Sequence, residues 1–149
     1  MRIRLLLVEE DATWRLRLVS ALSAEFDVQT VAHDEDPIKA ARLHRPDLAL
    51  IAVDHGRPAS SLRLCRILKT DVRPVGKIAL FDDRPPVFRL HEVQNIGVVD
   101  GYLAPVADAD EVVELTRAVW RGERPFLQRG VPAVGSLGRA WRRLLRTTG

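Results

Sequence analysis

The sequence has little or none of several features that define large classes of proteins. It has one cysteine, Cys65, among 149 residues, which excludes an internal disulfide and a cysteine cage for zinc. Its apolar runs, such as LALIAV, are far shorter than the roughly 20 residues that cross a bilayer. The N-terminal segment turns acidic at Glu9, before the apolar region of a signal peptide could be completed. These absences predict a cytoplasmic protein with no membrane span.

Motifs for nucleotide and metal chemistry are also missing. No glycine-rich phosphate loop follows the first apolar segment, where EEDATW would repel a nucleotide. Cys65 falls at an apolar position of a predicted helix and is expected in the core. No pair of nucleophile and base can be named, so we expect no enzyme activity and no cofactor. The histidines lack metal-ligand spacing and are interpreted as surface or packing residues. They are His33, His44, His55 and His91.

Charge is divided unevenly along the chain. Residues 121–149 hold seven arginines and one acidic residue, so this tail carries +6. Because the whole chain carries +3, the first 120 residues carry −3. A cationic tail can bind nucleic acid, an acidic protein surface or anionic lipid. The split predicts one domain over residues 1–121, followed by a basic linker and a short amphipathic helix over 122–149.

Apolar segments of strand length alternate with segments of helical periodicity. The strands are predicted at 3–8, 27–33, 47–53, 76–81 and 98–104, and the helices at 11–26, 34–44, 60–70, 86–95 and 108–122. Asp36 is an expected N-cap, Asp108 and Glu111 have capping-box spacing, and Gly97 is placed to end the fourth helix. Five strand–helix units in strict alternation predict a parallel sheet covered by helices on both faces. In such sheets the functional crevice lies beyond the carboxyl ends of the central strands.

Several segments, in order, resemble the receiver domain of bacterial two-component response regulators over about residues 3–121. LLLVEEDATWRLRLVSAL resembles the family's first strand and helix, and HRPDLALIAVD resembles its third strand. GVVDGYLAPVADADEVVELTRAVWRGE resembles its fifth strand and helix. The resemblance implies a three-layer (βα)5 flavodoxin-like doubly wound parallel sheet with strand order 2-1-3-4-5, here with a C-terminal helical extension. It also implies a place in phosphorelay signal transduction.

The chemistry of that family is phosphoryl transfer to an aspartate, and this sequence departs from it at three positions. The resemblance implies an aspartate at the end of the third strand, a hydroxyl after the fourth and a lysine after the fifth. Here Ala52 occupies the aspartate position and Phe81 the hydroxyl position. The lysine position holds Ala104 or Pro105, depending on the alignment. Three losses at one site predict a pseudo-receiver that takes up no phosphoryl group.

The acidic pair that helps to bind Mg²⁺ in the family corresponds to Glu9 and Glu10, interpreted here as structural acids. One alternative is a displaced phosphoacceptor, Asp54, which lies two residues beyond Ala52. Another is a weak divalent site formed by Glu9, Glu10 and Asp54. We expect no metal there, because acids near a turn are most often solvated or capping.

Without phosphoryl transfer, the domain is expected to act through contact with a protein partner, with a role in transcription regulation. The resemblance implies that the fourth helix, fifth strand and fifth helix form the partner surface. A homodimer through this face is the favoured interpretation. Phe81 is expected in the core, and Tyr102 either in the core or at this surface. The residues predicted for the surface are Tyr102, Val112, Leu115 and Val119.

The segment SLGRAWRRLLR predicts a cationic amphipathic helix in the tail. Trp141 and three leucines share one face, which is expected to dock on the domain or on a second copy. The alternative is contact with nucleic acid or a membrane surface through the opposite face. That face carries Arg139, Arg142, Arg143 and Arg146.

Overall fold

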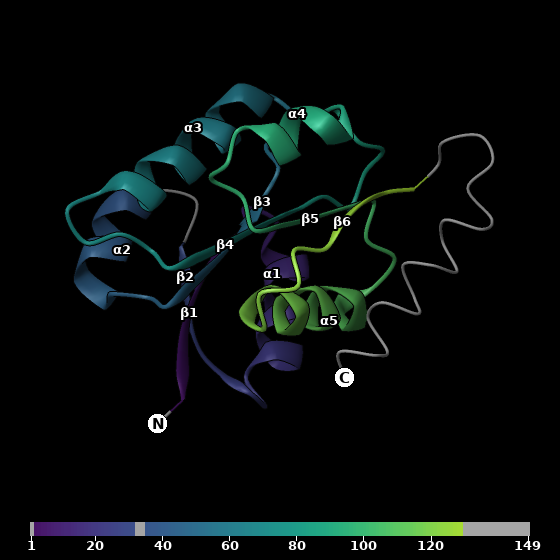
Figure 1. Ribbon diagram of the computed structural model, residues 1–149. Coiled ribbons are helices and arrows are strands. Elements are labelled where there is room, and N and C mark those ends of the chain that lie inside the picture. The colour runs from purple at the N-terminus through teal and green to yellow at the C-terminus, as the bar shows by residue number, and fades with distance from the viewer. Residues whose placement is uncertain (1, 32–34, 130–149) are drawn as a thin grey trace.

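Apolar strands form the centre of a parallel sheet in the computed structural model, which describes residues 2–31 and 35–129 (Figure 1). The strand order is β2-β1-β3-β4-β5-β6, and every neighbouring pair is parallel. The strands are β1 Ile3–Val8, β2 Phe26–Val31, β3 Leu48–Ala52, β4 Lys77–Phe81, β5 Gly101–Ala104 and β6 Phe126–Gln128. The helices are α1 Ala12–Leu22, α2 Pro37–His44, α3 Pro58–Thr70, α4 Leu90–Asn95 and α5 Ala109–Trp120. The doubly wound three-layer fold expected from the sequence is confirmed.

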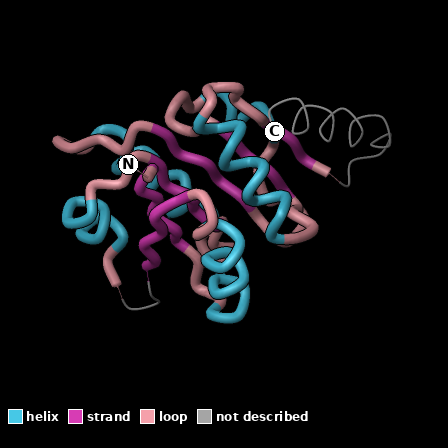
Figure 2. The backbone as a smooth tube through the Cα atoms, turned by 90° about the horizontal axis from the view of Figure 1, so that it is seen from below, coloured by secondary structure: helices cyan, strands magenta, loops and turns pink. Residues whose placement is uncertain are grey.

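Two hydrophobic cores lie on opposite faces of the sheet because successive side chains of a strand point to opposite sides. In β1, Leu5 and Leu7 pack with α1 and α5, whereas Leu6 packs with α2, α3 and α4. Figure 1 shows α1 and α5 on one face of the sheet and the other three helices on the opposite face. Figure 2 shows the same chain from below, with the strands lying between helices. In the described part of the chain, no helix is long and apolar enough to cross a membrane.

Local residues account for several helix ends. The carboxylate of Asp36 accepts from the N–H of Ile38 at 2.9 Å at the start of α2. Asp108 accepts from the N–H of Glu111 at 3.0 Å, while the Glu111 carboxylate reaches back to the N–H of Ala107 at 2.6 Å. This is a variant of the predicted capping box, shifted by one residue on the return bond. Gly97 follows α4 with φ +73°, a backbone conformation that favours glycine.

The sixth strand is a correction to the five-strand prediction. β6 extends the sheet beyond β5, with the N–H of Tyr102 donating to Pro125 O and the N–H of Arg129 donating to Ala104 O, both at 2.7 Å. The guanidinium of Arg129 also pairs with both carboxylate oxygens of Glu111, one of them at 2.7 Å. β6 therefore ties the chain after α5 back to the helix start.

The fourth helix is shorter than predicted because its first turns are held in another conformation. The helix was expected from residue 86, but α4 begins at Leu90. The side-chain amide of Gln128, on β6, donates to the backbone carbonyl of Phe88. The bond joins the Phe88 carbonyl to β6, and residues 86–89 before α4 form no regular helix. The contact depends on the position of β6 at the edge of the sheet.

Candidate functional site

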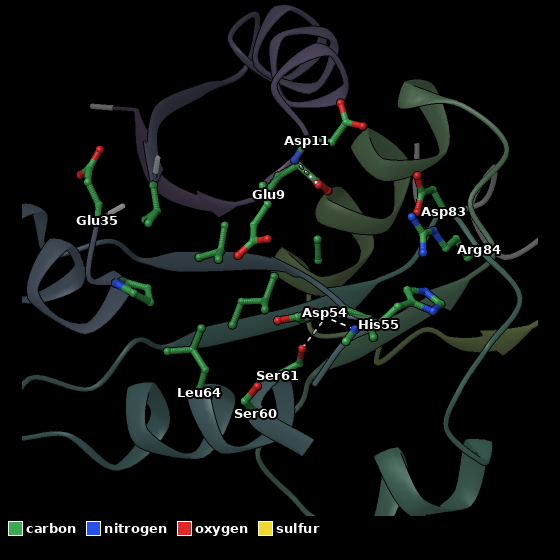
Figure 3. Close-up of a pocket in the computed structure, with 18 residues that line it drawn as sticks. Glu9, Asp11, Glu35, Asp54, His55, Ser60, Ser61, Leu64, Asp83 and Arg84 are labelled. Carbon is green, nitrogen blue, oxygen red and sulfur yellow. Dashed lines mark hydrogen bonds between the residues drawn. The ribbon is translucent and has the colours of Figure 1, made fainter. Parts of the chain in front are cut away.

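A pocket of about 500 Å³ lies at the carboxyl ends of β1, β3 and β4 (Figure 3). Val31, Ile51, Val53 and Leu64 supply an apolar wall, and Arg84 and His55 supply basic groups. Carboxylates outnumber those basic groups. The acidic residues that line it are Glu9, Glu10, Asp11, Glu35, Asp54 and Asp83. The pocket therefore favours cations and disfavours anions.

Four of the residues predicted for the degenerate phosphoacceptor site meet at this pocket. Glu9, Glu10, Ala52 and Asp54 all line it. Ala52 ends β3, and its side chain is half-buried against the core that contains Leu5 and Leu50.

The other three predicted positions lie elsewhere. Phe81 is fully buried in the core on the α1–α5 face, as expected for an apolar ring at that position. Ala104 is fully buried in the core on the opposite face, and Pro105 is half-buried. Neither Phe81 nor Ala104 presents a polar group to the pocket.

Glu9 is held at the pocket by backbone contacts. Its carboxylate accepts from the N–H of Asp11 at 3.1 Å, and its carbonyl accepts from the Arg15 guanidinium at 2.9 Å. Burial raises the pKa of Glu9 to about 7, and the negative charges of Asp83, Asp11 and Glu10 add to that effect. The hydrogen bond from Asp11 opposes the rise. The neutral form of the Glu9 carboxyl group is therefore favoured over a wider pH range than in an exposed glutamate.

Asp54 organises the turn between β3 and α3. Its carboxylate accepts from the N–H of Gly56 at 2.9 Å, and its own N–H donates to the hydroxyl of Ser61 at 2.9 Å. Figure 3 shows Asp54 and Ser61 joined in this way, on the opposite side of the pocket from Glu9. Over the described ranges, no group of three or more His, Cys, Asp or Glu side chains is arranged to hold a metal ion. The weak divalent site considered from the sequence gains no geometric support.

A contact between His55 and Asp82 was missed by the sequence analysis. His55 Nε2 lies 2.6 Å from Asp82 Oδ1, which also accepts from the N–H of Arg84 at 3.0 Å. Asp82 is only 2% exposed, and its Oδ2 has no hydrogen-bond partner. Burial raises the pKa of Asp82, and the bond from His55 opposes that rise. His55, interpreted as an ordinary surface or packing histidine, is instead the partner of a buried acid.

One signal for this pair was present in the sequence. His55 follows β3 and Asp82 follows β4, and the carboxyl ends of neighbouring parallel strands lie at the same edge of a sheet. The pairing of β3 with β4 would therefore have placed the two residues together.

The residues predicted for the partner surface are core residues, which corrects the assignment of the three α5 residues and places Tyr102 in the core, one of its two expected positions. Tyr102, Val112, Leu115 and Val119 are all 0% exposed. The Tyr102 hydroxyl lies 3.4 Å from the Gln128 side-chain amide, and burial raises its pKa to about 12 against the effect of that bond. Because β6 pairs with β5, the edge strand on this side of the sheet is β6. The surface at this edge is therefore formed by α4, β6 and α5 and does not include β5. The predicted tail residues Arg139, Trp141, Arg142, Arg143 and Arg146 lie outside the described residues.

The strand order and the position of the pocket are those of the flavodoxin-like doubly wound fold, which solved response-regulator structures share. Similar solved structures include the chemotaxis response regulator CheY4 of Vibrio cholerae, at 16% identity and TM-score 0.62, covering 82% of this chain and 99% of that one. HP1043, an orphan response regulator of H. pylori, has 18% identity and TM-score 0.62, covering 79% and 98%. A two-component response regulator of the LuxR family from Aurantimonas sp. SI85-9A1 has 16% identity and TM-score 0.64, covering 94% and 99%. No protein-family model and no curated protein matches the chain.

Proposed function

We propose that this chain is a receiver-like signalling module that takes up no phosphoryl group and acts by binding a protein partner. Ala52 carries the proposal. It ends the third strand at the edge of the pocket, and its methyl group can neither attack phosphorus nor bind a metal. Phe81 and Ala104, at the other two altered positions, add no hydroxyl or cation there.

Exposure of the full chain to acetyl phosphate and Mg²⁺ tests this function. We expect no mass gain of one phosphoryl group in intact-mass spectrometry, and no change in amide signals with beryllofluoride. Ala52→Asp is the informative variant, because it restores a carboxylate at the end of β3. A gain in the unaltered chain would contradict the proposal.

Asp54 as a displaced phosphoacceptor is the competing function. It lines the same pocket as Glu9, which favours it, but one of its oxygens already caps the turn at Gly56. If the unaltered chain gains mass and Asp54→Asn does not, the chain is a divergent working receiver. Asp83→Asn is the matched control, since it removes a neighbouring pocket carboxylate.

The partner surface is proposed as the face made by α4, β6 and α5, used in a homodimer. Trp120, at the end of α5, is 41% exposed, and the guanidinium of Arg124 lies 5.4 Å from the ring centroid of Phe126 on β6. Exposed aromatic and arginine side chains next to an edge strand are common anchors of protein interfaces.

Contact with nucleic acid through the tail, in transcription regulation, is a separate hypothesis. Steeply salt-dependent binding that is lost when the tail arginines are replaced by glutamine would support it.

We expect Trp120→Ser to lower the dimer fraction measured by light scattering over a concentration series. Leu43→Ser is the matched control, because Leu43 is 73% exposed on α2, away from β6. A chain that is monomeric at every concentration, or a dimer that is insensitive to Trp120→Ser, would place the partner surface elsewhere.

A further inference from the structure

Positive charge within the domain is concentrated in one stretch of the chain. Residues 37–77, from α2 to the start of β4, hold nine lysines and arginines and three aspartates, so this stretch carries +6. Because the first 120 residues together carry −3, the others up to residue 120 carry −9. A surface made by this stretch therefore attracts anions, whereas the rest of the domain repels them.

The cations of this stretch gather on the outer faces of α2 and α3. Figure 1 shows the two helices side by side on one face of the sheet, and they are in contact. Their ends are joined by Arg42, whose guanidinium donates to both carboxylate oxygens of Asp71, at 3.0 and 3.1 Å. We call the exposed cations around this pair the α2–α3 patch. They are Lys39, Arg45, Arg63, Arg66 and Arg73.

The charges of the α2–α3 patch are not compensated within the described ranges. None of its five side chains forms an ion pair with another residue of 2–31 or 35–129. Two neighbouring cations are used by the fold instead: Arg42 pairs with Asp71, and Lys69 Nζ donates to Asp100 at 2.7 Å. The patch therefore presents a group of cations that a polyanion can neutralise.

Two aliphatic side chains lie among these cations. Leu43, next to Arg42, is 73% exposed, and Val72, next to Asp71, is 95% exposed; no other large hydrophobic side chain of the described chain is as exposed. A lipid surface offers anionic headgroups to the cations and hydrocarbon to the aliphatic groups, whereas a nucleic-acid backbone offers only the anions. Protein interfaces are enriched in aromatic residues, and residues 37–77 contain none. Anionic lipid is therefore the partner that fits the patch.

We propose that the α2–α3 patch binds the surface of a membrane that contains anionic lipid. Its five cations lie among the headgroup phosphates, and Leu43 and Val72 enter the boundary between headgroups and acyl chains. The patch is separate from the partner surface on α4, β6 and α5. A membrane contact and a protein contact can therefore form on the same molecule.

Flotation of the full chain with lipid vesicles tests this contact. One set of vesicles contains equal parts of phosphatidylglycerol and phosphatidylcholine, and the other contains phosphatidylcholine alone. At about 0.1 M salt we expect the chain to float with the anionic vesicles and not with the neutral ones. Binding should be largely lost at about 0.5 M salt, where screening is strong.

Matched charge variants locate the binding surface. Arg63→Gln with Arg66→Gln should weaken binding to anionic vesicles about tenfold. Arg17→Gln with Arg121→Gln removes the same charge from exposed positions on α1 and at the end of α5, on the opposite face of the sheet, and should change binding little. Every variant keeps the basic tail, so its contribution is the same throughout. Absent binding, or binding that the two pairs of variants affect equally, overturns the proposal.

A second pair of variants tests the aliphatic contact. Leu43→Ser should weaken vesicle binding several-fold, because the leucine no longer enters the lipid. Leu16→Ser, at a leucine that is 69% exposed on α1, should have little effect. A duplex DNA of arbitrary sequence provides the competing anion. If the chain binds the duplex through Arg63 and Arg66 but does not float with anionic vesicles, the patch is a nucleic-acid surface and the lipid proposal is wrong.

Discussion

The carboxyl group of Glu9 lies where burial disfavours its charged form, so it makes the stability of the fold depend on pH. Its pKa is raised from 4.5 to about 7 in the folded chain, chiefly by burial. Between these values the folded state binds more protons than the unfolded state, so stability falls as pH rises through this window and levels off above about pH 7. The size of the effect is about 1–2 kcal/mol, because solvent at the pocket screens part of the charge.

Glu9→Gln should remove this pH dependence, since the amide oxygen can still accept from the N–H of Asp11. We expect urea unfolding to show the variant more stable than the unaltered chain at pH 8 by about 1–2 kcal/mol, and nearly equal to it at pH 4. Glu123→Gln, at an exposed loop position, should show no such difference. Parallel pH profiles for the unaltered chain and Glu9→Gln would contradict the assignment.

The contact of His55 with Asp82 contributes to the stability of the fold. His55 is the side-chain partner of Asp82, which is 2% exposed and would otherwise keep only the backbone bond from Arg84. His55→Ala should destabilise the fold by about 1–3 kcal/mol, the cost of leaving a buried acceptor without its partner. Urea unfolding at pH 7 measures this, with His91→Ala on the exposed face of α4 as the control. Equal midpoints for the two variants would show that the contact contributes nothing.

At the level of elements, the close approach of β5, α5 and the segment before β6 depends on Gly101. A Cβ atom at this position would lie 2.3 Å from Val119 Cγ2 and 3.3 Å from Pro125 Cγ. Gly101→Ala should therefore destabilise the fold by about 1–3 kcal/mol through overpacking.

Val119→Ala provides the matched test of the cause. It removes the methyl group that the added Cβ would strike, so the double variant should lose less than the sum of the two single losses. Thermal or urea unfolding of the four proteins gives the coupling. Strict additivity would mean that Gly101 is needed for some reason other than its distance from Val119.

What could be predicted from the sequence was local. The apolar run of β1, the cap at Asp36 and the stop at Gly97 depend on neighbouring residues, and each lies close to where it was expected. His55 and Asp82 are 27 residues apart in the sequence. β6 is only three residues long, and it forms a strand by pairing with β5. Neither leaves a periodic pattern in the sequence.

The partner surface shows a different limit. Helical spacing identified Val112, Leu115 and Val119 as one face of α5, and that face exists. The spacing does not say whether the face is turned to the sheet or to a partner. In the structure Val113 and Ala118 are also buried, because α5 packs both on the sheet and against α1. Only the packing of the whole domain decides which face remains free.

For the whole molecule, Cys65 offers a probe of cooperative unfolding. It lies on α3, fully buried between that helix and the sheet, and burial raises its thiol pKa to about 12. At pH 8 the thiolate, which is the form that reacts with alkylating reagents, is therefore strongly disfavoured in the folded state. Alkylation of the folded chain should therefore require an opening of the domain.

We expect iodoacetamide to modify Cys65 only where the chain unfolds, so that the extent of modification follows the loss of helical signal across a urea series. Val72→Cys introduces a second thiol at a position that is 95% exposed, which should react at once and verify the reagent. If Cys65 were modified rapidly at low urea while the helical signal stayed intact, α3 would be opening on its own. The pocket would then lose part of its lining while the rest of the domain stayed folded, because Ser61 and Leu64 lie on α3.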